Sequence, residues 1–478
     1  MAEPDDQGIV IEGRSRHGWA RMAVVYALMI AAGISAFLLI RDRGERLTAL
    51  PDIGLPASAV LVPPDADILF HVLLALTVII ITARVSGYLF GLLRQPTVIG
   101  EIVGGILLGP SLLGRIAPGV SAALFPAEVS PFINVIAQLG VILYMFMVGL
   151  ELDLRAVSRD GHSTLFISHA SILLPFILGS ALALALYPLL SPGDVPFTVF
   201  ALFLGVSMSV TAFPVLARIL TDMGLCRTRM GALSLTCAAI GDATAWCLLA
   251  FVVSVAQAQA MSAVRTLALT VSFVVIVLSV IAPLVRRKLL PYLERSGRLT
   301  RSGLAIVFAA MLLSAISTEL IGIHALFGAF LLGAVIPCDS KAAHELKASI
   351  EGIVSVLFLP AFFAYTGLRT QIGLVSGGTA WLACGAIIAV ACLGKFGGSV
   401  MAARLTGLGW RDSSALGTLM NTRGLVELIV LNIGLDLRVI TPQLFAMLVL
   451  MALFTTFMTT PALQLMTRGH PIDSRNAR

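Results

Sequence analysis

Long apolar segments, separated by short polar breaks, follow one another along almost the whole chain. Many of them are about 18 to 25 residues long, the length that an α-helix needs to cross the hydrocarbon core of a bilayer. Breaks rich in charged residues, proline or glycine divide the chain into fourteen predicted spans. We therefore expect an all-α polytopic membrane protein. The predicted spans are 19–40, 66–84, 97–114, 131–151, 164–188, 196–219, 229–255, 265–286, 302–320, 322–337, 350–369, 378–403, 413–436 and 442–466.

The composition supports this class and excludes others. Of the 478 residues, 58% are hydrophobic and 12% are charged, whereas soluble domains have about 25% charged residues. So few charges exclude a disordered chain, a water-soluble enzyme and a protein whose main partner is a nucleic acid. The sequence has no HExxH, GxSxG, GxGxxG or CxxC motif. We therefore expect no enzymatic activity and no cofactor, and the expected surroundings are the lipid bilayer.

Lysine and arginine are distributed unevenly over the loops between the predicted spans. Alternate loops and the C-terminal tail contain 20 of these residues, and the intervening loops contain 7. Because positively charged loops remain in the cytoplasm, the thirteen later helices are predicted to start outside and to end inside. Residues 1–18 and 467–478 are then short cytoplasmic tails.

The first span, 19–40, has two interpretations. It follows Arg14, Arg16 and Arg21 and could be a signal peptide. The run is long, and the flank after it is charged and has no clear A-x-A cleavage site, so a retained extra helix is favoured.

Short motifs indicate an internal repeat. The segment GGILLG at 104–109 resembles GAFLLG at 328–333, and MVGL at 147–150 resembles YTGL at 365–368. Repeats over about 66–255 and 302–466 place seven helices between equivalent positions. Because seven is odd, the two six-helix halves have opposite orientations, joined by a linker helix. Inverted repeats of this kind are typical of secondary transporters.

Each half also contains a polar break inside an apolar span, at 207–214 and at 421–424. Pro214 lacks a backbone donor, and Gly424 favours a non-helical conformation. In hydrocarbon, the freed backbone groups must face a cavity or other protein. We therefore predict two broken helices whose carbonyl groups and helix ends serve a cation. The candidate residues are Thr211, Pro214, Asn421 and Gly424.

Two further residues place charge inside apolar spans. An acidic side chain at the centre of a span, as at Asp242, is a functional hypothesis by default. Such a carboxylate holds either a proton or a cation, and this competition is the chemistry of exchange. Lys395 lies among small residues in another span. It either pairs with Asp242 in the cation-free state or is a structural tether.

Other titratable residues are predicted to have supporting roles. Arg423 and Glu427 have the i,i+4 spacing of a helical ion pair, and we expect them to support the second broken helix. Glu101 is expected near an interface. A solvated position is expected for Glu151, Asp153 and Arg155, and packed positions, rather than a proton relay, for His71, His169 and His324.

Several longer motifs resemble the sodium/hydrogen exchanger family. They are GEIVGGILLGPSLLG at 100–114, LGVILYMFMVGLELDL at 139–154, SVTAFPVLA at 209–217, GIHALFGAFLLGAVIP at 322–337 and MNTRGLVELIVL at 420–431. The branch they resemble most is the second cation:proton antiporter group, which includes bacterial potassium-efflux antiporters and plant cation/proton exchangers.

The resemblance covers about residues 66–466 and implies a fold, a mechanism and a site. The implied fold has thirteen helices and two crossed broken helices, in a homodimer with a moving core domain and a dimerisation domain. The implied mechanism is elevator-type alternating access. Asp242 matches the ion-binding aspartate and Lys395 the core lysine, while Thr211 and Arg423 match the crossed helices.

Gly241 departs from the family pattern, because members commonly have Asp, Asn or Gln before the ion-binding aspartate. With one carboxylate we expect one proton per monovalent cation, which is electroneutral exchange. After residue 466 we expect no nucleotide-binding domain, since about a dozen residues remain.

The expected function is exchange of Na⁺ or K⁺ for protons, with Asp242 holding the metal ion transiently, in a bacterial cell (inner or plasma) membrane. Two alternatives stay open: a sodium-coupled symporter of an organic solute, and a non-transporting membrane sensor or channel.

Overall fold

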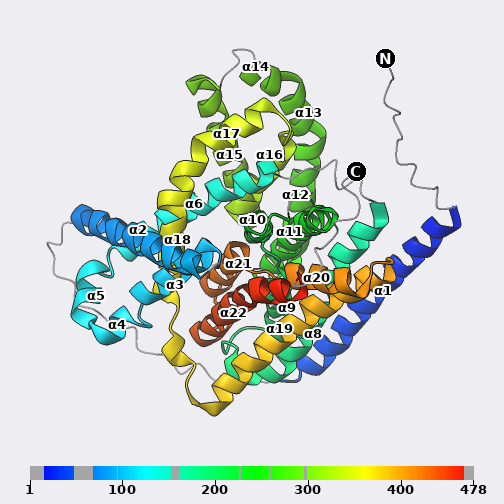
Figure 1. Ribbon diagram of the computed structural model, residues 1–478, viewed down its shortest axis with the longest axis horizontal. Coiled ribbons are helices and arrows are strands. Elements are labelled where there is room, and N and C mark those ends of the chain that lie inside the picture. The colour runs from blue at the N-terminus through cyan, green and yellow to red at the C-terminus, as the bar shows by residue number, and fades with distance from the viewer. Residues whose placement is uncertain are drawn as a thin grey trace.

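The computed structural model describes residues 16–47, 68–93, 95–151, 161–225, 228–257, 260–294 and 299–467 (Figure 1). Within these ranges the regular structure is entirely helical. Of the predicted tails, 1–18 and 467–478, residues 16–18 belong to the first helix and residue 467 to the last. The rest of both tails, together with Asp153 and Arg155, lies outside the described residues.

The first part of the chain forms α1 and the first repeat. The helices are α1 (Arg16–Gly44), α2 (Ile68–Leu92), α3 (Thr97–Leu108), α4 (Leu113–Ile116), α5 (Pro118–Leu124), α6 (Ser130–Glu151), α8 (Gly161–Leu190), α9 (Phe197–Ser209), α10 (Phe213–Asp222) and α11 (Arg229–Gln257).

The linker and the second repeat follow. The linker contains α12 (Ala260–Ile276), α13 (Ala282–Leu284) and α14 (Leu290–Glu294), joined by two π-helical turns. The second repeat contains α15 (Arg301–Ile321), α16 (Ala325–Val335), α17 (Lys341–Ile353), α18 (Leu359–Arg369), α19 (Gly377–Leu405), α20 (Trp410–Met420), α21 (Leu425–Asp436) and α22 (Pro442–Thr467).

The predicted spans agree with these helices. In the described ranges, twelve helical segments are long and apolar enough to cross a membrane, and α16 is a shorter apolar helix. The remaining predicted span, 413–436, is divided into α20 and α21 by a break at 421–424. Each of the fourteen predicted spans therefore corresponds to a helix, to a broken pair or to a helix continued by a short turn.

The helices pack as two units, and most close helix–helix contacts lie within a unit. In the frame unit, α2, α3, α6 and α15–α18 pack on one another, at the left and top of Figure 1. In the crossing unit, α8–α11 and α19–α22 pack together, at the centre and lower right. Each repeat contributes helices to both units, as expected if the units are built from equivalent parts of the two halves.

The repeat motifs pack against one another in a reciprocal pattern. Helix α3, with the first GGILLG-type motif, packs on α18, and α16, with the second, packs on α6. The backbones touch at the glycines: a Cβ built on Gly149 would lie 3.0 Å from the Cα of Gly333, and one built on Gly333 would lie 3.0 Å from the Cα of Gly149. In the other pair, a Cβ built on Gly109 would lie 2.3 Å from the carbonyl oxygen of Gly367, and one built on Gly367 would lie 2.1 Å from the carbonyl carbon of Gly105. This exchange of partners confirms the inverted repeat.

Helix α1 lies outside both repeats and packs on α8 and α9 of the crossing unit. The ring of Tyr26 packs edge-on against His169 at 5.5 Å, and Phe37 lies 5.8 Å from Phe176. At its C-terminal end the Thr198 hydroxyl donates to Glu45 (3.0 Å). Hydrogen bonds from Arg41 and Thr198 lower the pKa of Glu45, so its carboxylate stays charged at this contact.

We predict that Gly149→Ala and Gly333→Ala each lower the melting temperature of the detergent-purified protein. The added methyl group collides with backbone atoms of the facing helix, and overpacking of this kind costs about 1–3 kcal/mol. Gly385→Ala in α19 is the matched control, because a Cβ there has no neighbour within 4 Å. Equal melting temperatures for all three variants would mean that the α6–α16 contact is not close-packed.

Candidate functional site

The two broken helices cross and are hydrogen-bonded to each other. The backbone N–H of Ala212, between α9 and α10, donates to the carbonyl of Thr422, between α20 and α21 (3.0 Å). The Thr211 hydroxyl donates to the carbonyl of Met420 (3.4 Å). Four half-helix ends therefore meet here: α9 and α20 end in carbonyl groups, and α10 and α21 begin with N–H groups. Such ends carry partial charges of opposite sign.

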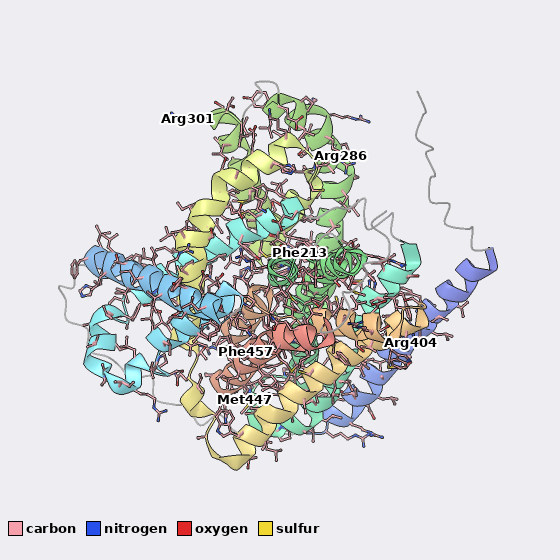
Figure 2. The ribbon with its side chains drawn as sticks, in the orientation of Figure 1. Phe213, Arg286, Arg301, Arg404, Met447 and Phe457 are labelled. Atoms are coloured by element: carbon pink, nitrogen blue, oxygen red, sulfur yellow. The ribbon has the colours of Figure 1, made fainter. Side chains whose placement is uncertain are left out.

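Two of the predicted residues explain how the breaks fit together. Pro214 is the second residue of α10, where its missing N–H breaks no intrahelical hydrogen bond, so it starts a half-helix rather than kinking a continuous one. At Gly424 a Cβ would lie 2.7 Å from Val215, so glycine lets the second break approach α10. Figure 2 shows Phe213, the first residue of α10, near the centre of the molecule.

Two buried cations satisfy the carbonyl end of α9. The guanidinium of Arg423 donates to the carbonyls of Ser207 (2.9 Å) and Met208 (2.6 Å). The ammonium of Lys395 donates to the carbonyl of the next residue, Ser209. Both side chains are fully buried. Three successive carbonyls, which the break leaves without helical partners, are therefore bound by positive charge.

Arg423 is also fixed from its own side of the crossing. It forms the ion pair with Glu427 that the spacing predicted, with Nη1 and Oε2 3.0 Å apart. Its backbone is bound to α22, because its N–H donates to the Thr456 hydroxyl (3.0 Å), which donates to its carbonyl (2.6 Å). Thr456 is not among the residues predicted from the sequence, where its one signal is a pair of threonines inside an apolar span.

Asp242 differs from these residues because its charge has no partner. Its side chain is 2% exposed, and neither carboxylate oxygen has a hydrogen bond within the described ranges. The backbone N–H of Phe213 approaches it as a hydrogen-bond donor, but too loosely to satisfy either oxygen, and the ammonium of Lys395 attracts it without forming an ion pair. A buried carboxylate without a partner is costly. The arrangement therefore favours uptake of a proton or a cation.

Other polar atoms near Asp242 also lack partners in the described part of the chain. They are Nε1 of Trp246, one turn later on α11, and, at the second break, Oδ1 of Asn421 and Oγ1 of Thr422. A Cβ built on Gly241 would touch only the Ser168 hydroxyl, at 3.6 Å. A Cβ therefore fits at Gly241, but the sequence places no side chain there.

The remaining predicted residues lie away from the crossing or play structural parts in packing. Glu101 is buried in the second turn of α3, and its Cγ lies against the Gly87 position of α2. Glu151 is partly exposed and pairs with Lys347 (2.7 Å). His169 bonds to the Leu165 carbonyl at 2.8 Å. The ring of His71 packs on Phe70, and Nδ1 of His324 has no partner among the described residues.

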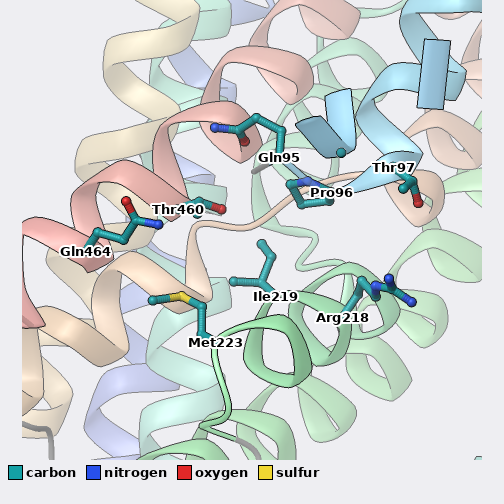
Figure 3. Close-up of a pocket in the computed structure, with 9 residues that line it drawn as sticks. Gln95, Pro96, Thr97, Arg218, Ile219, Met223, Thr460 and Gln464 are labelled. Atoms are coloured by element: carbon teal, nitrogen blue, oxygen red, sulfur yellow. The ribbon is translucent and has the colours of Figure 1, made fainter. Parts of the chain in front are cut away.

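A cavity of about 600 Å³ separates the two units beside the crossing (Figure 3). Gln95, Pro96 and Thr97, at the start of α3, face Ile219 and Met223 of the α10 region and Thr460 and Gln464 of α22. A second cavity, of about 10 Å³, lies further along the same boundary and is lined in part by Val98, Arg423 and Gly424. The boundary between the units thus leads from an open cavity to the second break.

Residues 77–468 match the family described as "Sodium/hydrogen exchanger, transmembrane". The chain belongs to the sodium/hydrogen exchanger family.

Relatives agree with this family assignment. The chain is 43% identical over 403 residues to the Na⁺/H⁺ antiporter NhaS4 of Synechocystis sp., covering 83% of this chain and 97% of the relative. It is 37% identical to the K⁺/H⁺ antiporter 1 of Saccharomyces cerevisiae, covering 79% of this chain and 44% of that longer protein. The Na⁺/H⁺-K⁺ antiporter GerN of Bacillus cereus is 29% identical, with 83% of this chain and 96% of GerN covered.

The exchanger fold is also found in a solved structure. The sodium proton antiporter MjNhaP1 from Methanocaldococcus jannaschii aligns with a TM-score of 0.59, covering 84% of this chain and 99% of that chain. Its sequence is 14% identical, so this likeness bears on the fold alone.

We predict that Arg423→Met strongly destabilises the protein. The change removes the partner of two carbonyls and leaves Glu427 buried without its cation, and breaking a buried pair typically costs about 3–5 kcal/mol. Glu427→Gln keeps an acceptor for Arg423, so we expect this variant to lose less stability. Thermal unfolding in detergent measures both. Arg265→Met is the control, since Arg265 is exposed on α12, and an Arg423 variant as stable as this control would contradict the capping role.

Proposed function

We propose that this protein exchanges a monovalent cation, Na⁺ or K⁺, for protons across the membrane. The observation that carries the proposal is the unpartnered carboxylate of Asp242, buried beside two crossed broken helices. A cation and a proton compete for this group, because each neutralises it. The names of the relatives, which are Na⁺/H⁺, K⁺/H⁺ and cation/H⁺ antiporters, support the same exchange.

In this proposal Asp242 carries the exchangeable charge, and the charged residues at the break have fixed positions. Arg423 and Lys395 hold the carbonyl end of α9 and so fix the break that contains Thr211. The backbone N–H of Phe213, at the same break, acts on Asp242. The hydroxyl oxygen of Thr211 is the second proposed ligand of the bound Na⁺ or K⁺. Lys395 is proposed as the positive neighbour that favours loss of the proton from Asp242 before a cation arrives.

Movement of the crossing unit against the frame unit is the proposed mechanism of alternating access. The apolar character of the packing between the units and the cavity of about 600 Å³ between them support a boundary that can slide. The antiporter domain is then residues 66–466, with the C-terminus in the cytoplasm of a bacterial cell. A homodimer joined through the frame units is the assembly that we propose.

The alternatives have less support. A symporter of an organic solute requires a second polar pocket beside the cation site, and a channel or sensor requires no exchangeable buried carboxylate. Since the similar relatives are named as antiporters, we do not favour either alternative.

We predict that Asp242→Asn abolishes cation-dependent proton movement. Everted vesicles are loaded with protons, and a pH-sensitive dye reports dissipation of the gradient after addition of Li⁺, Na⁺, K⁺ or Rb⁺ in turn. The amide cannot take up a proton or balance a cation, so no ion gives a response. Asp194→Asn, the same change at an exposed loop position, is expected to behave as wild type. Exchange that survives Asp242→Asn would show that the carrier lies elsewhere.

We also predict that wild-type exchange moves no net charge. One carboxylate carries either one proton or one monovalent cation, so the two half-cycles transport the same charge. Solid-supported membrane recordings of proteoliposomes are expected to show no sustained current, although the dye assay reports exchange. Gly241→Asp adds a neighbouring carboxylate where a Cβ has space, and it is the variant in which a current is expected. A sustained wild-type current would overturn one-for-one exchange.

A further inference from the structure

Side chains of the two units are joined at the end of the boundary that is predicted to be extracellular. Arg369 is the last residue of α18 in the frame unit, and Asp436 is the last residue of α21 in the crossing unit. Their side chains form an ion pair with Nη2 and Oδ1 2.7 Å apart. The same guanidinium donates through Nη1 to Oδ1 of Asn432, one turn earlier on α21 (3.1 Å).

Further contacts within and between the units hold this ion pair in place. The guanidinium of Arg369 lies over the ring of Tyr365, 5.2 Å from its centre. The amide of Asn432 donates to the Thr366 hydroxyl of α18 (2.8 Å) and to the Leu428 carbonyl of its own helix (2.9 Å). Arg369 therefore binds two side chains in the last turns of α21, and Thr366 of α18 accepts a third hydrogen bond from the same helix.

The boundary is tight at this end. Another contact between the segments lies nearby, because Gln443 at the start of α22 donates to the Leu374 carbonyl (3.1 Å). The cavity behind the ion pair, lined in part by His324, Ile433 and Asp436, is about 30 Å³, the volume of about one water molecule. The cavity beside Gln95 and Thr460, also between the units, is about 600 Å³. The pathway is therefore open at one end and closed at the other.

We propose that Arg369, Asn432 and Asp436 form a latch that closes the extracellular end of the transport pathway and opens in each cycle. This inference rests on the proposed function and orientation. Arg369 is one of the seven basic residues in the loops assigned to the outside. In the state described here the latch is closed, and the outward-facing state requires the crossing unit to leave Arg369.

The exposure of the pair suits a contact that must break. Arg369 and Asp436 are 21% and 43% exposed, whereas the Arg423–Glu427 pair, which lies within one unit, is fully buried. Water can solvate both partners of the exposed pair as they separate, so their separation costs little. The buried pair has no such substitute. The weak pair thus joins parts that move relative to each other, and the strong pair joins parts that stay together.

The test uses a cysteine that reports access from outside. Ile433→Cys places a smaller side chain with a reactive thiol beside the small cavity. Labelling with a membrane-impermeant maleimide is timed in right-side-out vesicles, above the background of the parent chain without this cysteine. Arg369→Met and Asp436→Asn are each expected to speed labelling about three- to fivefold, as expected for loss of one partly exposed ion pair. Arg369→Asp combined with Asp436→Arg is expected to restore slow labelling.

Lys347→Met is the matched control. It removes a similarly exposed ion pair, Lys347–Glu151, that joins two helices of the frame unit, so labelling is expected to stay slow. Unchanged labelling in both latch variants, with elution profiles of folded protein, would overturn the latch, as would faster labelling in inverted vesicles alone. Cation/proton exchange is measured separately in the same vesicles without maleimide. Absence of exchange in the wild-type protein would contradict the proposed function. The labelling rates would still show whether Arg369, Asn432 and Asp436 close the extracellular end.

Discussion

Every break in a membrane helix releases carbonyl and N–H groups that lipid cannot satisfy. The carbonyl end of α9 is the place where this constraint is strongest, because three successive carbonyls lie at the centre of the fold. Arg423, from the break between α20 and α21, and Lys395, from α19, bind them. The second break is then held by the same Arg423 through Glu427 and Thr456. One set of contacts thus stabilises both breaks at once.

This arrangement explains why the two buried cations at the crossing bind backbone groups and why the two buried carboxylates have different surroundings. Glu427 is paired and has a fixed role, whereas Asp242 has no hydrogen-bond partner among the described residues. The cations satisfy backbone groups first, and this leaves the carboxylate of Asp242 without a direct salt bridge. Under the proposed function, a site that must release its ion benefits from such a division, because the scaffold is strongly bonded and the proposed exchangeable group is not.

Much of the fold follows from properties that are local in sequence. Apolar length predicted the spans, glycine spacing predicted the repeat, and the four-residue spacing of Arg423 and Glu427 predicted their ion pair. Contacts between distant segments were not predictable in this way. Lys395 bonds to Ser209, 186 positions away, rather than to the aspartate considered for it. The partners of Thr456 and Arg369 depend likewise on how whole helices are placed, and a single sequence carries no signal for that placement.

The position of α1 has a consequence for the surrounding lipid. This helix is bound to α8 and α9, and residues such as Val25, Leu28 and Leu39 on its outer side remain exposed. Any vertical displacement of the crossing unit therefore carries an additional apolar helix through the bilayer. The perimeter over which lipid tails must stretch or compress becomes longer, and mismatch in thickness has an energetic cost per ångström. If the crossing unit moves as proposed, the length of the lipid acyl chains therefore changes the free energy of that movement through α1, a helix that lies outside both repeats.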